Sequence, residues 1–214
     1  MADPRPETAL LARLDLPRVP QQARSRQKRD ALLAAAGELF AQRGYAATTA
    51  DDIAAAAGVS VGTFYSYFRN KRQLFMALFA ASIDDIGALG IAEIDFSPAP
   101  RLIVRAVIKQ AMERDALFSG LRRACMELLP VDEEFAAFHQ QFNEWICGQI
   151  ETAVRRSAAA GIIWPDLDIP ATCWLVTVLI DQAWREQPAG EPARVERECD
   201  ALADLIYRSL FRQP

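Results

Sequence analysis

The sequence is poor in the residues on which most enzymes and metal proteins depend. It has a single histidine, His139, and its four cysteines lie more than twenty residues apart: Cys125, Cys147, Cys173 and Cys199. No CxxC or Cys/His pair has the spacing of a zinc site, so buried, reduced thiols are the expected state. No nucleophile motif occurs, and the acidic residues fall mostly at helix starts or on polar faces. We therefore expect no catalytic activity, metal or cofactor.

Long apolar runs are also missing. The longest strongly apolar stretch, Ala171–Ile180, has ten residues, which is far too short to cross a bilayer. No apolar run follows the first basic residues, so we expect no signal peptide and a cytoplasmic location. Runs of Val, Ile and Thr with alternating polarity do not occur, whereas apolar residues recur every three or four positions. This periodicity predicts an all-α fold.

Charge divides unevenly along the chain. Residues 21–72 hold eight Lys/Arg against four Asp/Glu, a net charge of +4, whereas residues 73–214 have a net charge of −8. A small basic segment joined to a larger acidic one suggests that only the first part meets a polyanion.

Proline and glycine mark the expected boundaries in the first part. Residues 1–22 include four prolines and no sustained period, so we expect a flexible arm. Helices are then expected over 24–43, 50–57 and 61–68, with a fourth beginning at residue 71. Gly44 and Gly58 end the first two of these helices. Suitable N-cap side chains precede the last three: Thr48 or Thr49, Ser60 and Asn70.

The third of these helices lies in the segment GVSVGTFYSYFRNK, residues 58–71. Phe64 and Phe68 share one helical face and are expected to pack inward, against Phe40, Tyr45 and Ile53. Two short helices joined by a tight glycine turn have the layout of a helix-turn-helix.

The opposite face of this helix carries small residues. Gly62, Thr63 and Ser66 point away from the two phenylalanines, with Tyr65 and Tyr67 at the flanks. Small outward residues allow a helix backbone to approach a DNA groove, while tyrosine hydroxyls reach phosphates. The alternative is that the tyrosines are core-edge residues with solvated hydroxyls.

Basic residues flank the same segment. Lys71 would place a positive charge beside the free N–H groups of a helix start, which suits a phosphate. Lys71 and Arg72 could instead be a solvated first turn. For the basic set at the start of the first helix, a solvated turn and contact with the DNA backbone are equally supported: Arg24, Arg26, Lys28 and Arg29.

The stretch ALLAAAGELFAQRGY and, two residues later, TTADDIAAAAGVSVGTFYSYFRNKRQLF together resemble the DNA-binding domain of the TetR family of bacterial repressors. The likeness covers roughly residues 26–86. It implies a DNA-binding domain at 23–86, with its helix-turn-helix at about 49–68, and a helical regulatory and dimerisation domain at 87–214. The implied DNA-binding residues are Thr49, Ser60, Val61, Gly62, Thr63, Tyr65, Ser66, Tyr67 and Lys71. The chain departs from the family pattern at the small Ser66 and at Val61, which helical phase places nearer the core.

The second part of the chain predicts further helices over 101–112, 116–129 and 132–160. Aromatic residues recur at helical spacing in the last of these, which is more typical of a core than of a binding site. The family resemblance implies a small-molecule cavity among these helices. Candidate wall residues are Met112, Phe118, Phe138, Phe142 and Trp145, and a buried His139 or Gln149 would indicate ligand chemistry.

The last two helices are expected at 171–180 and 192–211. The first is apolar all round and the second has a wide apolar stripe, which predicts that a second subunit covers them, although packing within one chain is the alternative. The expected homodimer interface consists of Trp174, Val178, Val195, Cys199, Leu202, Ile206 and Leu210.

The sequence therefore predicts a homodimeric, DNA-binding transcriptional regulator. The resemblance favours a repressor that binds a palindromic DNA operator and is released by a small-molecule ligand. Two alternatives stay open: an activator of the same fold, and a helical protein-interaction module that does not bind DNA.

Overall fold

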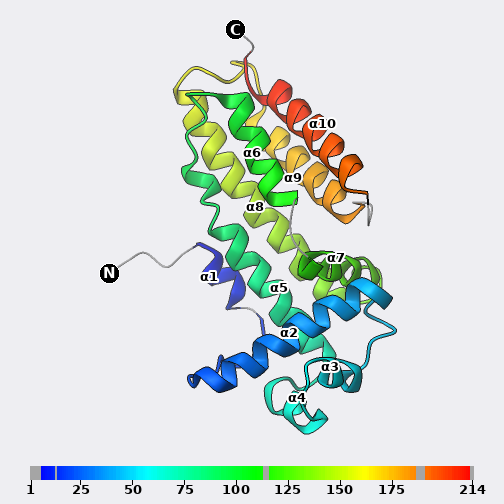
Figure 1. Ribbon diagram of the computed structural model, residues 1–214. Helices are drawn as coiled ribbons and strands as arrows, with labels where there is room; N and C mark the ends of the chain where they lie inside the picture. Colours follow the sequence, from blue (N-terminus) through cyan, green and yellow to red (C-terminus); the bar gives the residue numbers. More distant parts are fainter. Residues whose placement is uncertain (1–5, 13, 113–115, 187–190, 213–214) are drawn as a thin grey trace. The chain divides into compact units, whose positions relative to one another are not determined.

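The computed structural model describes residues 6–12, 14–112, 116–186 and 191–212, except for the side chains of residues 6, 7, 9, 116–119 and 192. The described chain is all-α, and its only strand-like feature is an isolated bridge between Ile163 and Phe211 (Figure 1). The helices are α1 (Pro6–Leu11), α2 (Ala23–Arg43), α3 (Ala50–Ala56), α4 (Val61–Tyr67), α5 (Lys71–Gly87), the 3-10 helix η1 (Ile91–Glu93), α6 (Pro100–Met112), α7 (Ala116–Leu128), α8 (Glu133–Ala159), α9 (Ile169–Arg185) and α10 (Pro192–Leu210).

Most of these bounds agree with the expected ones to within two residues, and two differ. Residues 6–11 form α1, with Leu10 buried, in the segment expected to be a flexible arm. The apolar run predicts a helix over 171–180 only. α9 in fact continues through a polar last turn to Arg185.

The chain forms two compact units. The first contains residues up to 85 together with 114–136, and the second contains 86–113 together with 137–214. One division lies between residues 85 and 86, next to the domain boundary expected between 86 and 87. The inclusion of α7 in the first unit was not anticipated.

Helix α5 provides the centre of the first unit. Residues 73–80 are all buried, and the ring of Phe75 packs edge-on against Phe135, with 4.9 Å between centroids. The stretch Lys71–Glu93 is also long and apolar enough, by length and composition alone, to span a membrane. Residues 73–80 of this stretch are buried in the first unit, and the core helix of a globular unit has the same composition, which explains the apolar character.

Helices α2 and α7 approach each other closely in the first unit. A Cβ atom added to Gly120 of α7 would lie 1.8 Å from the carbonyl oxygen of Gly37 in α2 and 3.1 Å from the Ala41 nitrogen. The two backbones are therefore in direct contact at a point where both residues are glycine.

Replacing Gly120 with alanine should destabilise the first unit by about 1–3 kcal/mol, because the two helices must separate to admit a methyl group. Urea unfolding followed by circular dichroism measures this. Gly148→Ala is the matched control, because Gly148 is exposed on α8 with nothing within 4 Å of an added Cβ. That change should stabilise by about 0.5–1 kcal/mol through helix propensity. Equal stability of Gly120→Ala and the wild type would contradict the close contact.

In the second unit, α6 and α10 lie side by side and antiparallel (Figure 1). Their buried faces share one apolar core, which includes Val104 and Ile108 from α6. Three ion pairs follow the solvent-facing edge at intervals of four residues, with numbers rising in α6 and falling in α10: Arg101–Asp204 at 2.8 Å, Arg105–Asp200 at 2.6 Å and Lys109–Glu196 at 3.9 Å.

Candidate nucleic-acid interface and associated sites

Side-chain caps fix both short helices of the helix-turn-helix. Thr49 Oγ1 accepts a hydrogen bond from the Asp52 backbone nitrogen, while Asp52 Oδ2 accepts one from the Thr49 nitrogen, so α3 begins with a complete capping box. Ser60 Oγ caps α4 by accepting from the Thr63 nitrogen. The turn between the helices passes through Gly58 at φ +68°, which favours glycine. The expected caps at Thr49 and Ser60 are thereby confirmed.

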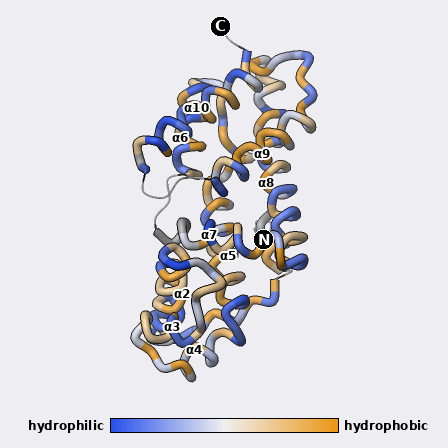
Figure 2. The backbone as a smooth tube through the Cα atoms, turned by 90° about the vertical axis from the view of Figure 1, so that its right-hand side faces the viewer, coloured by the Kyte–Doolittle hydropathy of each residue, from blue (hydrophilic) through white to orange (hydrophobic). Residues whose placement is uncertain are grey.

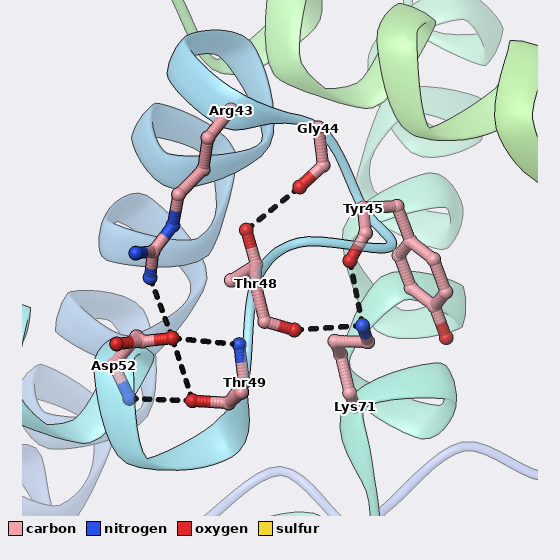
Figure 3. A network of polar contacts seen from close by, with 7 residues as sticks. All are labelled: Arg43, Gly44, Tyr45, Thr48, Thr49, Asp52 and Lys71. Carbon is pink, nitrogen blue, oxygen red and sulfur yellow. Dashed lines mark hydrogen bonds and ion pairs between the residues drawn. The ribbon is translucent and has the colours of Figure 1, made fainter.

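Asp52 also binds the end of the preceding helix. Its Oδ2 lies 2.6 Å from Arg43 Nη2, and hydrogen bonds from Thr49, followed by this contact with Arg43, lower the pKa of Asp52 to about 2 (Figure 3). One carboxylate therefore joins the end of α2 to the start of α3.

Because its pKa is depressed in the folded state, the Asp52 carboxylate should stabilise the chain above about pH 4 and lose that contribution as pH falls toward 2. Asp52→Asn should remove this part of the pH dependence. Its thermal unfolding temperature should fall less between pH 5 and pH 2 than that of the wild type. A directly observed wild-type Asp52 titration near pH 4, by carboxyl NMR, would contradict the capping geometry.

Helix α4 has the two faces that its sequence predicts. Phe64 and Phe68 are buried, with exposures of 0% and 1%, and their ring centroids lie 5.9 Å apart. On the other side Gly62 and Ser66 are exposed, and Tyr65 is 55% exposed. A Cβ atom on Gly62 would meet only Ser60 Oγ, at 3.9 Å. The outer surface of α4 at Gly62 and Ser66 is therefore exposed and carries only small side chains.

Val61 and Ser66 of α4 have surroundings that the sequence pattern does not predict. Val61 was expected nearer the core, but as the first residue of the helix it is 36% exposed. Ser66 Oγ donates to the Thr63 carbonyl at 2.6 Å, and the Thr63 hydroxyl lies 2.9 Å from Ser60 Oγ. Local bonds thus engage these hydroxyls, which leaves mainly the methyl group of Thr63 and the tyrosine hydroxyls of this face for an outside partner.

The side chain of Lys71, the first residue of α5, reaches the loop between α2 and α3. Its ammonium donates to the carbonyls of Tyr45 at 2.6 Å and Thr48 at 2.7 Å, and lies 4.0 Å from the centroid of the Tyr45 ring (Figure 3). Partial burial lowers the pKa of Lys71, although the Glu127 carboxylate opposes this shift. An ammonium has three N–H donors, and these bonds use two of them. Contact of Lys71 with phosphate stays a prediction, but the structure adds a loop-anchoring role.

Other cations of this region also have partners within the first unit. Arg72 is not a solvated first-turn residue, because it forms a two-pronged contact with Asp132, at 2.6 and 3.0 Å. Arg29 lies over the ring of Phe68 with only 14% of its side chain exposed. Arg24 and Arg26 are exposed at the start of α2, where Arg26 donates to the carbonyls of residues 20 and 21.

Four of the five candidate ligand residues belong to the second unit, whereas Phe118 belongs to the first. Met112 and Phe138 are each 6% exposed, Phe142 and Trp145 are partly buried, and the side chain of Phe118 lies outside the described residues. The rings of Phe142 and Trp145 are neighbours, with centroids 6.0 Å apart. The indole nitrogen of Trp145 is buried and has no hydrogen-bond partner among the described residues.

His139 is buried in the second unit, which keeps it a candidate for ligand contact, and it already has a partner within that unit. Its Nε2 lies 3.3 Å from Asp181 Oδ1, and Arg185 Nε donates to the other carboxylate oxygen at 3.0 Å. Burial raises the pKa of Asp181, but His139 and Arg185 outweigh this and lower it overall. The partly buried Gln149 lies farther along α8.

The expected interface residues of α10 need correction. Cys199, Leu202, Ile206 and Leu210 are 3–8% exposed and belong to the core of the second unit, because the apolar stripe of α10 packs within that unit. Val195 is partly buried against the same core. Trp174 and Val178 of α9 are each 40% exposed.

The exposed face of α9 includes residues that the sequence analysis missed. Leu175 is 66% exposed and Leu179 36%, and Figure 2 shows the hydrophobic character of this helix. Together with Trp174 and Val178 they recur at three- and four-residue spacing, a signal present in the sequence. Leu205 of α10, 55% exposed, is the other large apolar residue exposed in these two helices. We call Trp174, Leu175, Val178 and Leu179 the α9 face.

Comparison with known proteins gives consistent relatives. Residues 32–78 match the family described as bacterial regulatory proteins, tetR family. The chain is 35% identical over 200 residues to the transcriptional regulator AcuR of Cereibacter sphaeroides, covering 90% of this chain and 80% of AcuR. Salmonella enterica GusR has the same fold, with a TM-score of 0.71 at 19% identity over 86% of this chain and 96% of GusR. SmeT, the repressor of a Stenotrophomonas maltophilia multidrug efflux pump, has a TM-score of 0.65 at 22% identity, covering 86% of this chain and 91% of SmeT. A structure of SmeT in complex with triclosan also has this fold.

Proposed function

Because the chain belongs to the TetR family of bacterial regulatory proteins, whose members are DNA-binding transcriptional regulators and not enzymes, we propose that it is a homodimeric repressor. In this proposal it acts in the cytoplasm, binds a palindromic DNA operator and leaves it when a small molecule binds the second unit.

The outer face of α4 is the observation that carries the DNA-binding mode. Gly62 and Ser66 are exposed above a buried pair of phenylalanines, so the helix is held firmly while its small-residue side stays open. In the proposed complex this side enters the major groove, the Thr63 methyl meets a thymine methyl, and Tyr65 and Tyr67 reach phosphates. Thr49 and Ser60, at the starts of α3 and α4, are also proposed to contact the DNA backbone.

The α9 face supports the homodimer. Four large apolar side chains on one side of a helix are costly to leave in water, and a second copy of the same helix would cover them. Two-fold symmetry then presents two α4 helices to successive major grooves about 34–36 Å apart, which explains why the operator would be palindromic.

The second unit supports a ligand-responsive role. SmeT, of the same fold, is known in complex with triclosan. In this chain the partly buried aromatic residues of α8 lie near a buried histidine, and Trp145 offers a buried N–H donor. A ligand that binds better when the two α4 helices are wrongly spaced would weaken DNA binding through that difference in affinity alone.

Sequencing of the genomic fragments that the purified protein retains tests the proposal. We expect a two-fold symmetric motif overlapping promoters, reduced transcription from these promoters in vitro, and affinity that falls steeply with salt. Compounds that raise the melting temperature should release these fragments. An asymmetric motif, or a tight ligand that leaves affinity unchanged, would argue against the homodimer or the ligand release, respectively.

A further inference from the structure

The backbone of the α2–α3 loop, residues 44–49, is held by side chains of its own and of two other helices. Within the loop, Thr48 Oγ1 donates to the Gly44 carbonyl at 2.7 Å. Lys71 of α5 binds the carbonyls of Tyr45 and Thr48 (Figure 3). Because this loop leads directly into α3, and α4 follows after one turn, its conformation acts together with the buried residues of α3 and α4 to set where both helices lie in the first unit.

Helix α7 supplies the remaining support. Glu127 Oε2 accepts a hydrogen bond from the Ala46 nitrogen at 2.7 Å. One turn earlier, Arg123 Nη1 donates to the carbonyls of Ala41 and Gln42, both at 3.0 Å, and so covers the end of α2. Arg123 Nε also lies 3.6 Å from Glu127 Oε1. One face of α7 therefore binds the last turn of α2 and the loop that follows it.

Gly44 makes this contact possible. Its φ of +89° favours glycine, and a Cβ atom there would lie 2.1 Å from Glu127 Oε1 and 3.2 Å from Arg123 Nε. Any larger residue would therefore push the carboxylate away from Ala46. The glycine that ends α2 thus also provides the space through which α7 reaches the loop.

We propose that Glu127 is a positioning residue for DNA recognition, because it holds the α2–α3 loop through the Ala46 N–H group and so fixes α3 and α4 in the arrangement that docks on DNA. The inference rests on the proposed DNA-binding mode and adds a residue that lies outside the matched segment 32–78. Without this charge-assisted bond the loop samples more conformations, and binding to DNA must supply the cost of ordering it.

The sign of the effect separates this role from simple electrostatics. DNA repels carboxylates, so removing an acidic residue from the DNA-binding unit normally raises affinity. A positioning role predicts the opposite for Glu127→Ala. Glu127→Gln should behave almost as the wild type, because the amide oxygen can still accept the Ala46 N–H group. Glu38→Ala is the matched control, because Glu38 is an exposed carboxylate on α2 in the same unit.

The experiment measures the affinity of each variant for one retained genomic fragment, at several salt concentrations and below the melting temperature of every variant. Glu127→Ala should bind roughly tenfold more weakly, the size expected for a lost bond to a charged group. Its salt dependence should match that of the wild type, because no phosphate contact is lost. Hydrogen exchange at the Ala46 amide, measured without DNA, should accelerate in Glu127→Ala and stay slow in Glu127→Gln.

Affinity of Glu127→Ala equal to or above that of the wild type would overturn the inference. So would equal losses in Glu127→Ala and Glu127→Gln, because these would assign the effect to charge and not to the hydrogen bond. A wild-type protein that retains no DNA would instead overturn the proposed function, whatever the exchange rate at Ala46.

Discussion

Gly62→Glu should lower affinity for the retained genomic fragments by roughly hundredfold or more and leave the chain folded. The added side chain would occupy the face on which α4 approaches the groove, and its charge would face phosphates, where like-charge contacts cost several kcal/mol. The fold should tolerate it because Gly62 is exposed and an added Cβ meets only Ser60 Oγ at 3.9 Å.

Fluorescence anisotropy with a labelled fragment measures this loss, and circular dichroism checks the fold. Ala81→Glu, which adds the same charge at an exposed position of α5, should change affinity far less. Gly62→Ala should stabilise the chain slightly, since alanine favours helix, yet bind DNA more weakly than the wild type. Unchanged affinity of Gly62→Glu would show that this face of α4 does not enter the groove.

Leu175→Glu should convert the proposed dimer into monomers and thereby reduce affinity for the retained genomic fragments on the order of hundredfold. Leu175 is the most exposed residue of the α9 face, and the change would bury a carboxylate of each subunit in the proposed apolar interface. A monomer keeps one α4 helix and loses the gain from simultaneous binding of two half-sites. Its own unit should still fold, because Leu175 is 66% exposed in the single chain.

Leu102→Glu is the matched control for this second prediction. Leu102 is a leucine of the same unit with nearly the same exposure, 67%, but it lies on α6. Sedimentation equilibrium should find Leu102→Glu dimeric and Leu175→Glu monomeric at micromolar concentration. If both variants stay dimeric, the α9 face is not the interface.

The caps and the buried face of the helix-turn-helix were predicted well because their signals are local. Thr49 and Ser60 cap the helices that directly follow them, and Phe64 and Phe68 share a face through helical period alone. None of these inferences needs knowledge of which distant segments meet.

The failures concern contacts between distant segments. The apolar stripe of α10 could cover a partner or its own core, and sequence periodicity does not distinguish these, so Cys199 and Ile206 were assigned to the wrong surface. The carbonyls bound by Lys71 lie 23 and 26 residues earlier in the chain, and Ala46 and Glu127 are 81 residues apart. Such pairs become visible only when helices α2, α5 and α7 are placed in one unit.

The contact between Gly37 and Gly120 limits how the first unit can respond to a stimulus. Side chains between two helices usually accommodate small displacements by changing rotamer. Here the backbones of Gly37 and Gly120 are in direct contact, so no side chain lies between them to adjust. A shift of α7 must therefore become sliding, tilting or separation of the whole helix relative to α2. A small displacement of α7 would therefore displace the end of α2 as well. Such rigid coupling between two helices suits a switch with two discrete positions.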